Sequence, residues 1–313
     1  MSDLTALPKG SLILVTGANG YIGSHTINTL LQLGYRIRGT VRSDKPWLTK
    51  LFRNKYGENV YEQVVITRLD DAEALGQAMT GVAGVVHVAS DVSFTDDPNA
   101  AIPRVVRATE SALEAAAKQP SVKRVVLTSS AFAASIPAPN KKGVYVDEST
   151  FKAEGERAAW KWVEEHKPSY AFNTILPNFN TGEILHPEIK GSTMGFARDL
   201  LKGQVDMLHL FMPQFYVDVV DVARLHAIAL LAEPVKSQRI WASAEPVNTS
   251  DFIDVVHELR PDNKLIPEKP ADEGRDLTEL PPAAKAEALL QKYFGQKGWT
   301  PFKKSVEAGI RDL

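Results

Sequence analysis

Residues 12–35 read LILVTGANGYIGSHTINTLLQLGY, and this stretch decides the fold of the chain. A short apolar run ends at Thr16, as in a buried strand. A helical pattern follows, because apolar residues such as Ile22 and Leu30 recur at helical spacing, and it ends at Gly34. The stretch therefore predicts a strand, a tight turn and a helix, in the order that opens a nucleotide-binding βαβ unit.

Three glycines mark the predicted turn, and each position has a mechanical reason. Gly17 turns the chain sharply, Gly20 lets the backbone approach a diphosphate, and Gly23 lets the helix lie close to the strand. Unpaired N–H groups and the dipole at a helix N-terminus favour an anionic phosphate there. Glycines also mark ordinary turns, so the nucleotide interpretation depends on the rest of the chain. The predicted cofactor contacts in this loop are Gly17, Asn19, Gly20, Tyr21, Ile22 and Gly23.

The composition limits the classes of protein to be considered. The chain has 313 residues, of which 44% are hydrophobic and 24% charged, with a formal net charge of -2. These values are typical of a soluble globular protein of one large domain or one and a half, and no basic stripe favours a nucleic-acid partner. The N-terminal residues are too few and too polar for a signal sequence, and no apolar run approaches the ~18 residues of a membrane span. We therefore expect a cytoplasmic protein without a membrane partner.

The sequence contains no cysteine. Disulfides, thiolate metal sites and a cysteine nucleophile are therefore excluded. The histidine, aspartate and glutamate residues show no spacing typical of metal ligands, and we predict no metal site.

The second strand bears on the choice of cofactor. Apolar and polar residues alternate over residues 35–42, as in a half-buried strand. In this type of fold an acidic residue at the strand end holds the ribose 2′-hydroxyl of NAD, whereas an arginine accommodates the 2′-phosphate of NADP. Arg42 stands at that end, with Arg38 and Lys45 as candidate helpers, while Asp44 is a candidate NAD-type acid. The sequence favours NADP over NAD, the alternative being an ordinary solvated strand end.

Strands and helices alternate along the first part of the chain. Further strands are predicted at residues 63–67, 84–90, 122–130 and 171–176, and helices at residues 70–79 and 100–118. This order predicts an α/β fold of the Rossmann type, with a doubly wound, mostly parallel sheet. The strand at 122–130 ends in Ser129 and Ser130. A serine at the carboxyl end of a parallel strand points into the crevice where ligands bind, although such serines are more often turn residues.

The chain after the sixth strand departs from this alternation. We predict a dinucleotide-binding domain over residues 1–180 and a smaller substrate lobe over residues 181–313, parts of which return to the main sheet. Residues 246–313 predict two or three short helices separated by proline-rich turns. Apolar residues thicken over 196–216, which favours a hydrophobic substrate, although core packing explains most of them equally well. His226 is expected to be a buried structural histidine.

From residue 12 to about residue 226 the chain resembles the fungal aldehyde and carbonyl reductases and the plant dihydroflavonol reductases of the extended short-chain dehydrogenase/reductase superfamily. The matching stretches are TGANGYIGSH, GTVRS, GVVHVAS, KRVVLTSS, KAEGERAAWKW, ILPNFNTG and YVDVVDVARLHA. The resemblance implies NADPH-dependent reduction of a small-molecule ketone or aldehyde, with secondary metabolism as a plausible setting. Sugar-nucleotide epimerases and dehydratases are the rival enzymes, but the AAWKW stretch matches the reductases better.

In this family the chemistry rests on a serine, a tyrosine and, four residues after the tyrosine, a lysine on the same helix. The tyrosine donates a proton to the carbonyl oxygen, the serine holds that oxygen, and the lysine binds the nicotinamide ribose and lowers the tyrosine pKa. The resemblance assigns Lys152 as the lysine, because KAEGERAAWKW matches the family's helix. It assigns Ser130 as the serine, with Ser129 in reserve.

The family's tyrosine is missing from its expected position. Glu148 stands four residues before Lys152, where it should be ionised and form an (i, i+4) ion pair with that lysine. Relatives carry a longer loop here, which in this chain is compressed into residues 141–151. Three explanations stay open: an impaired chain that still binds cofactor, a catalytic Tyr145 from the shortened loop, or Glu148 as an acid with a raised pKa. The extended pattern around Tyr145 makes a packing role equally suitable.

The resemblance also implies cofactor contacts outside the first loop. Asp70 stands in the turn that lies against the adenine in relatives, although it also suits a helix cap. Ala89 and Ser90 stand at a strand end that lies along the cofactor, and Pro177 stands where relatives pack a proline on the nicotinamide. Ser192 belongs to a stretch that resembles a loop over the cofactor phosphates, with a helix cap as the alternative.

The sequence as a whole predicts an NADPH-dependent reductase of ketones or aldehydes that is a monomer or a homodimer. The alternative from a different class is a catalytically impaired NADP-binding homologue that acts as a binding or sensor protein.

Overall fold

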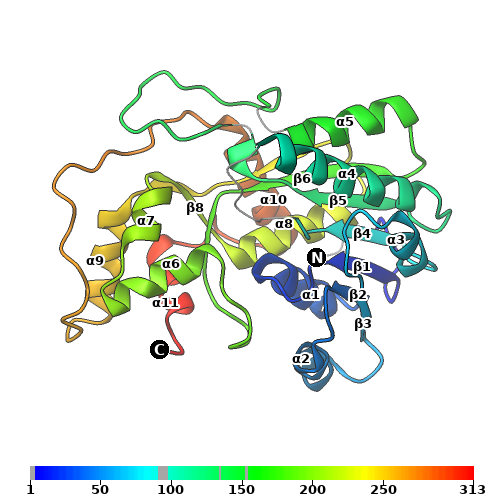
Figure 1. The fold of residues 1–313 in the computed structure, drawn as a ribbon, viewed down its shortest axis with the longest axis horizontal. Helices are drawn as coiled ribbons and strands as arrows, with labels where there is room; N and C mark the ends of the chain where they lie inside the picture. Colours follow the sequence, from blue (N-terminus) through cyan, green and yellow to red (C-terminus); the bar gives the residue numbers. More distant parts are fainter. Residues whose placement is uncertain (1–3, 91–97, 134, 152–153) are drawn as a thin grey trace.

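The computed structural model describes residues 4–90, 98–133, 135–151 and 154–313. Its centre is a seven-stranded parallel sheet with the order β3-β2-β1-β4-β5-β6-β9, and a three-stranded sheet with the order β10-β8-β7 lies in the lobe beside it (Figure 1). The strands of the large sheet are β1 (Leu12–Thr16), β2 (Arg36–Val41), β3 (Tyr61–Val65), β4 (Gly84–His87), β5 (Arg124–Thr128), β6 (Ala171–Pro177) and β9 (Arg239–Ala242). Those of the small sheet are β7 (Phe179–Thr181), β8 (Gln214–Asp218) and β10 (Glu245–Val247).

The large sheet is doubly wound, as the sequence predicts. From β1 the chain proceeds through β2 to the edge strand β3, returns to pair β4 with β1, and continues outward through β5 and β6. All neighbouring strands of this sheet are parallel, so their carboxyl ends lie at one edge. The far edge strand, β9, is an addition that the sequence analysis did not predict.

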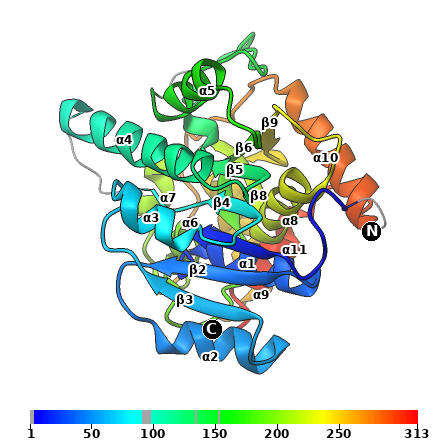
Figure 2. The same cartoon turned by 90° about the vertical axis from the view of Figure 1, so that its right-hand side faces the viewer.

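Helices cover both faces of the large sheet (Figure 2). One face carries α1 (Tyr21–Gln32), α2 (Pro46–Tyr56), α8 (Val219–Leu231) and α10 (Pro281–Phe294). The other carries α3 (Ala72–Ala78), α4 (Pro98–Ala117) and α5 (Glu154–His166). A separate hydrophobic core forms on each face, because successive strand residues point to opposite sides of the sheet. Ile13 and Val15 of β1 belong to the first core, whereas Leu14 between them belongs to the second.

The third strand begins two residues earlier than the apolar run predicts. Tyr61 pairs with Ile37 of β2 and is buried against Phe52 of α2, with 5.0 Å between the ring centroids. The register is therefore set by an aromatic contact with a helix that precedes the strand. This contact is tertiary and leaves no local sequence pattern. The run of valines therefore predicted the strand but not the residue at which it begins.

The lobe at the left of Figure 1 has its own core. Its helices are α6 (Thr193–Asp199), α7 (Asp206–Phe211), α9 (Thr249–Leu259) and α11 (Phe302–Gly309). Phe252 of α9 lies between Phe179 and Phe302, with ring centroids 5.5 Å and 4.7 Å away. The predicted boundary between residues 180 and 181 falls inside β7, and α8, β9 and α10 belong to the layers of the large sheet.

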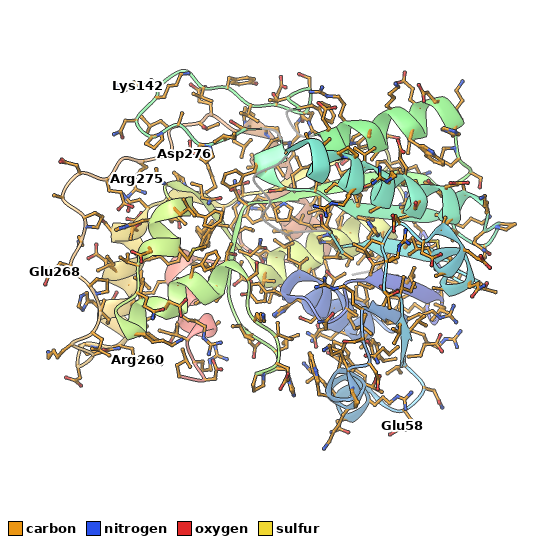
Figure 3. The ribbon with its side chains drawn as sticks, viewed as in Figure 1. Glu58, Lys142, Arg260, Glu268, Arg275 and Asp276 are labelled. Carbon is orange, nitrogen blue, oxygen red and sulfur yellow. The ribbon has the colours of Figure 1, made fainter. Side chains whose placement is uncertain are left out.

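Two loops close over the carboxyl edge of the sheet near the lobe. Figure 3 labels Lys142 on one of them and Arg275 on the other. The backbone of Asn140 donates to the Arg275 carbonyl at 2.9 Å, and Val146 donates to the Glu279 carbonyl at 3.0 Å. The loop after β5 is therefore tied to the connection between α9 and α10.

A buried carboxyl group links the lobe to α8. Asp218 caps α8 by accepting from the Val220 amide at 2.8 Å, and the Ser305 hydroxyl of α11 donates to its other oxygen at 2.6 Å. Burial raises the pKa of Asp218 to about 6. The folded chain therefore favours the protonated form of this group more than the unfolded chain does.

This pKa shift predicts a pH dependence of stability. The contribution of Asp218 to the free energy of unfolding is fully present below about pH 4, where the unfolded group titrates, and is lost as the pH rises through about 6. We expect Asp218→Asn, which keeps a capping oxygen, to remove about 1 kcal/mol of the decline in stability between pH 5 and pH 7, measured by urea unfolding. The exposed Asp262→Asn is the control. Equal pH slopes for the wild type and Asp218→Asn would contradict the assignment.

Candidate active site

The candidate site lies where the winding of the large sheet reverses, between β1 and β4. The Thr16 hydroxyl accepts from the backbone amides of Val88 and Ala89 at 3.1 and 3.0 Å, and lies 3.1 Å from Nδ1 of His87. Burial lowers the pKa of His87 to about 4, so this ring is neutral at physiological pH. The loops after β1 and β4 are thus fastened side by side at the crevice where parallel α/β sheets bind ligands.

The loop after β1 is packed tightly around its glycines. Gly17 has a φ of +69°, and a Cβ there would lie 3.1 Å from the backbone of Ala89. A Cβ on Gly23 would lie 2.2 Å from the Gly17 carbonyl oxygen, so the first turn of α1 rests on the loop itself. Gly20 is the N-cap of α1 and has no side chain to satisfy the helix amides. The first turn therefore presents N–H groups to an anion, as a dinucleotide diphosphate requires.

The side chain of Tyr21 does not face this loop. Its hydroxyl donates to the Gly182 carbonyl at 2.7 Å, and the residue is 5% exposed. One turn later, Nε2 of His25 lies 2.8 Å from the Glu183 carbonyl oxygen. Tyr21 and His25 therefore anchor the chain after β7 along α1. The predicted cofactor contact at Tyr21 is limited to its backbone, while Asn19 and Ile22 are half-buried beside it.

The charged residues in and after β2 differ in whether other described residues bind them. Arg38 donates to Glu62 at 2.6 Å and to the carbonyls of Ala78 and Thr80, so its predicted role as a phosphate helper is wrong. Asp44 accepts from Gln63. Arg42 is exposed and, like Lys45, makes no hydrogen bond or ion pair with the residues that the structure describes. Of these three cations, Arg42 and Lys45 after the end of β2 are therefore the two available to bind a phosphate.

Neither Asp70 nor Ser192 caps a helix with its side chain, which was the alternative predicted for each. Asp70 pairs with Arg68 at 3.1 Å, and the hydrogen bond from Arg68 lowers its pKa. The α3 cap is the next residue, Asp71, which accepts from Ala74. Ser192 occupies the N-cap position of α6 but its side chain accepts no capping hydrogen bond, and it is exposed with a φ of +47°. Its hydroxyl is thus not needed by the helix.

The two serines after β5 have different surroundings. The Ser129 hydroxyl donates to Glu156 of α5 at 3.1 Å. The Ser130 hydroxyl accepts from the Phe132 amide at 3.2 Å, in the short 3-10 turn η1 (Ala131–Ala133), and keeps its own proton to donate. Pro177 is buried at the end of the neighbouring β6. Ala89 is half-buried and Ser90 exposed at the end of β4.

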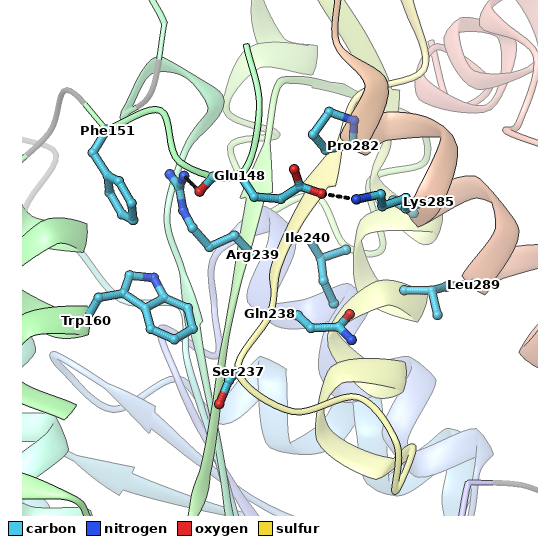
Figure 4. A pocket seen from close by; sticks show the side chains of 11 residues that line it. Glu148, Phe151, Trp160, Ser237, Gln238, Arg239, Ile240, Pro282, Lys285 and Leu289 are labelled. Carbon is cyan, nitrogen blue, oxygen red and sulfur yellow. Dashed lines mark hydrogen bonds and ion pairs between the residues drawn. The ribbon is translucent and has the colours of Figure 1, made fainter. Parts of the chain in front are cut away.

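The region of the missing tyrosine differs from the expectation. Glu148 precedes α5, which begins at Glu154, and its carboxylate forms an ion pair with Lys285 of α10 (Figure 4). Glu148 thus has a partner on α10, and the predicted (i, i+4) pair involves Lys152, which lies outside the described residues. The hydrogen bond from Lys285 lowers the pKa of Glu148, so the prediction of an acid with a raised pKa is wrong.

Tyr145 lies in an extended segment and is exposed. It forms a β-bridge with Glu279, and its side chain is 58% exposed. The next residue, Val146, is 2% exposed and packs with Ala131 and Trp241. Because successive residues of an extended segment point to opposite sides, the burial of Val146 directs Tyr145 outward. The bridge to Glu279 thus holds Tyr145 in an extended segment with its side chain exposed, and its catalytic role stays a prediction.

A small cavity lies near the carboxyl ends of β5, β6 and β9. It has a volume of about 20 Å³, room for roughly one water, and is lined among others by Ala131, Asn178 and Trp241. Trp241 is 1% exposed, and its indole N–H has no hydrogen-bond partner. The sequence analysis missed this residue, because a single tryptophan in a four-residue strand carries no local signal.

The surroundings of His226 agree with the predicted buried structural role. His226 is buried, with Nε2 2.7 Å from the Thr128 hydroxyl and Nδ1 2.8 Å from the Val222 carbonyl, and burial lowers its pKa to about 4. Within the described part of the chain, no group of three or more histidine, aspartate or glutamate side chains could hold a metal ion. No helix there has both the length and the apolar character to cross a membrane.

Comparison with known proteins agrees with the resemblance. Residues 13–241 match the NAD dependent epimerase/dehydratase family. Ketoreductase adrE from Penicillium rubens is 42% identical, with 97% of both chains covered. Aldehyde reductase 2 from Sporidiobolus salmonicolor is 36% identical, with 99% of this chain and 97% of the relative covered. The solved structure of yeast methylglyoxal/isovaleraldehyde reductase Gre2 complexed with NADPH is 22% identical, with a TM-score of 0.79 over 96% of this chain and 97% of that chain.

The alignment with adrE is longer than this chain. It runs over 327 positions although it covers 97% of a chain of 313 residues. The relative therefore has residues opposite gaps in this chain.

The glycine packing predicts a specific defect. We expect Gly23→Ala to lower the free energy of unfolding by about 1–3 kcal/mol and to weaken NADPH binding, because the new methyl would collide with the Gly17 carbonyl. Gly76→Ala in α3 is the matched control, since its Cβ would meet open space and a helical alanine is about 1 kcal/mol more favourable than glycine. Thermal unfolding and NADPH fluorescence titration test both variants. Equal behaviour of the two variants would refute the close packing.

Proposed function

The chain belongs to the NAD-dependent epimerase/dehydratase family, and we propose that it is an NADPH-dependent reductase of ketones or aldehydes. The observation that carries the proposal is the tightly packed glycine loop at residues 17–23, on the same edge of the sheet as the end of β5 that leads to Ser130. The names of the relatives, a ketoreductase and an aldehyde reductase, support this reaction class. We propose a cytoplasmic monomer or homodimer that acts in secondary metabolism.

The residues present suit an NADP dinucleotide. The amides of the first α1 turn would hold the diphosphate, and the uncommitted Arg42 would bind the 2′-phosphate. When bound, NADPH supplies the hydride for the carbonyl carbon. The Ser130 hydroxyl would donate a hydrogen bond to the carbonyl oxygen, and Lys152 is proposed to bind the nicotinamide ribose, as the resemblance implies. Asp70, Ala89, Ser90, Pro177 and Ser192 are proposed as further cofactor contacts.

The substrate is proposed to be a hydrophobic carbonyl compound. Phe132 and Ile136 follow Ser130 closely in the chain, and 37% and 65% of their surface is exposed. Large apolar side chains left in water beside a strand-end loop favour an apolar ligand over a sugar nucleotide. This preference supports the reductase proposal over an epimerase or dehydratase.

A second candidate function follows from the surroundings of two side chains. Tyr145 faces solvent, and Glu148 is bound to Lys285 with a lowered pKa. A carboxylate bound to a lysine is a poor proton donor, and the described residues give Tyr145 no hydrogen bond that would orient its hydroxyl. This observation favours an NADP-binding homologue with impaired catalysis, in which the glycine loop and Arg42 bind cofactor without rapid turnover.

The choice of cofactor can be tested at Arg42. We expect Arg42→Ala to weaken NADPH binding by about 10- to 100-fold, because a charged hydrogen bond to phosphate is lost, and to leave NADH binding unchanged. Arg36→Ala, at the opposite end of the same strand, is the control and should change neither affinity. Fluorescence titration with both dinucleotides gives the two constants. Equal loss of NADPH and NADH affinity would contradict the 2′-phosphate role.

Turnover separates the two candidate functions. The reductase should oxidise NADPH with a panel of aromatic aldehydes and keto esters, and Ser130→Ala should lower kcat by about 100-fold or more, since a donor to the developing oxyanion is removed. Ser169→Ala, an exposed serine before β6, should leave kcat unchanged. NADPH binding without turnover of any carbonyl in the wild type would favour the impaired homologue, and absence of NADPH binding would refute both.

A further inference from the structure

A buried ion pair joins the far edge of the sheet to α5. Arg239, the first residue of β9, donates through Nε to Oε1 of Glu156 at 2.9 Å and through Nη2 to Oε2 at 2.8 Å. Only 5% of the Arg239 side chain and 1% of the Glu156 side chain is exposed. The two parallel hydrogen bonds fix the guanidinium and the carboxylate in one plane, which gives the pair a single geometry.

The rest of the guanidinium holds the chain that leads into α5. Its Nη1 donates to the carbonyl oxygens of Glu148 and Thr150 at 2.7 and 2.9 Å. The Phe151 ring lies against the face of the guanidinium, whose carbon is 3.6 Å from the ring centroid. Figure 4 shows both side chains in the lining of a pocket. Residues 148, 150 and 151 are thus fastened to one side chain of the edge strand.

The rest of the carboxylate holds the end of β5. Glu156 accepts from the Ser129 hydroxyl at 3.1 Å and from the Thr174 hydroxyl of β6 at 2.8 Å. The Ser129 hydroxyl is thus bound to α5. The hydroxyl of its neighbour Ser130 instead bonds within the loop after β5. One ion pair therefore connects the end of β5, the middle of β6 and the start of β9 with the segment before α5.

The position of this pair in the chain indicates what it serves. Phe151, directly before Lys152 in the sequence, and Glu156, four residues after it, touch the same guanidinium. A buried ion pair is rarely more stabilising than apolar residues of the same volume, whereas a fully bonded one specifies a unique arrangement. A cofactor-binding lysine and a serine on separate elements need such an arrangement.

We propose that Arg239, held by Glu156, is a positioning residue that fixes the chain on both sides of Lys152 against the Ser130 end of β5 and thereby controls NADPH binding. The inference rests on the proposed function, because it concerns the same cofactor site. Neither Arg239 nor Glu156 touches the cofactor in this proposal; both act through the residues they hold.

The test compares two buried arginines of one sheet. Arg239→Met and the double variant Glu156→Met/Arg239→Met should raise the dissociation constant for NADPH by roughly tenfold or more, measured by fluorescence titration below the unfolding temperature. The double variant leaves no unpaired buried charge and should unfold at a higher temperature than Arg239→Met. Arg124→Met is the control, because Arg124 is 3% exposed and binds the carbonyls of Leu230, Ala232 and Val235 at the other end of β5. It should lower the unfolding temperature and leave NADPH affinity within about twofold of the wild type.

A double-mutant cycle with Lys152→Met distinguishes positioning from mere stability. If Arg239 acts through Lys152, the losses of NADPH affinity in Arg239→Met and Lys152→Met should not add, whereas those of Arg124→Met and Lys152→Met should add. Additive losses for Arg239→Met, or unchanged NADPH affinity in the folded double variant, would overturn the proposal. A wild-type protein that binds no NADPH would overturn the proposed function and this inference with it.

Discussion

The parallel direction of all seven strands in the large sheet is the constraint on which the site depends. Parallel pairing brings every strand's carboxyl end to one edge, and the reversal of winding between β1 and β4 leaves a crevice there. The loops that meet at this edge come from residues far apart in the chain. Thr16 fastens two of them, and the tight contact between Gly17 and Gly23 leaves backbone rather than side chains at the surface of the crevice. A dinucleotide needs both the open crevice and the exposed amides.

The sequence predicted those parts of the fold that depend on local pattern. The strand, turn and helix of residues 12–35 follow from periodicity and glycine spacing, which act within one element and its neighbour. The sequence did not predict β9, because four residues with one buried tryptophan resemble any short apolar run. It placed β3 two residues late, because the contact of Tyr61 with Phe52 is tertiary. Local sequence pattern thus predicted which elements form, whereas the residue at which a strand such as β3 begins depends on tertiary contacts.

The candidate site was predictable to a similar limit. Sequence and resemblance selected Ser130 and Arg42, and the structure leaves both side chains able to donate to a ligand. They could not show that Arg38 is committed to backbone carbonyls of another loop, or that Glu148 meets a lysine 137 residues away. A charge in a sequence does not reveal its partner, because the partner is chosen by packing. Glu156 and Arg239 went unnoticed for the same reason.

The hydrogen bonds of the segment before α5 explain why a tyrosine at position 148 would not lie on the helix. Val146 is bound to Glu279, and Arg239 binds the carbonyls of residues 148 and 150, so the chain runs directly from the lobe connection to α5. Residue 148 lies in a turn that faces Lys285, not on the helix that carries Glu156. A tyrosine one turn before Lys152 requires the helix to start earlier, and the residues that would form that turn are already held by Arg239. A longer segment between Val146 and α5 would leave residues free of Arg239 to form that turn.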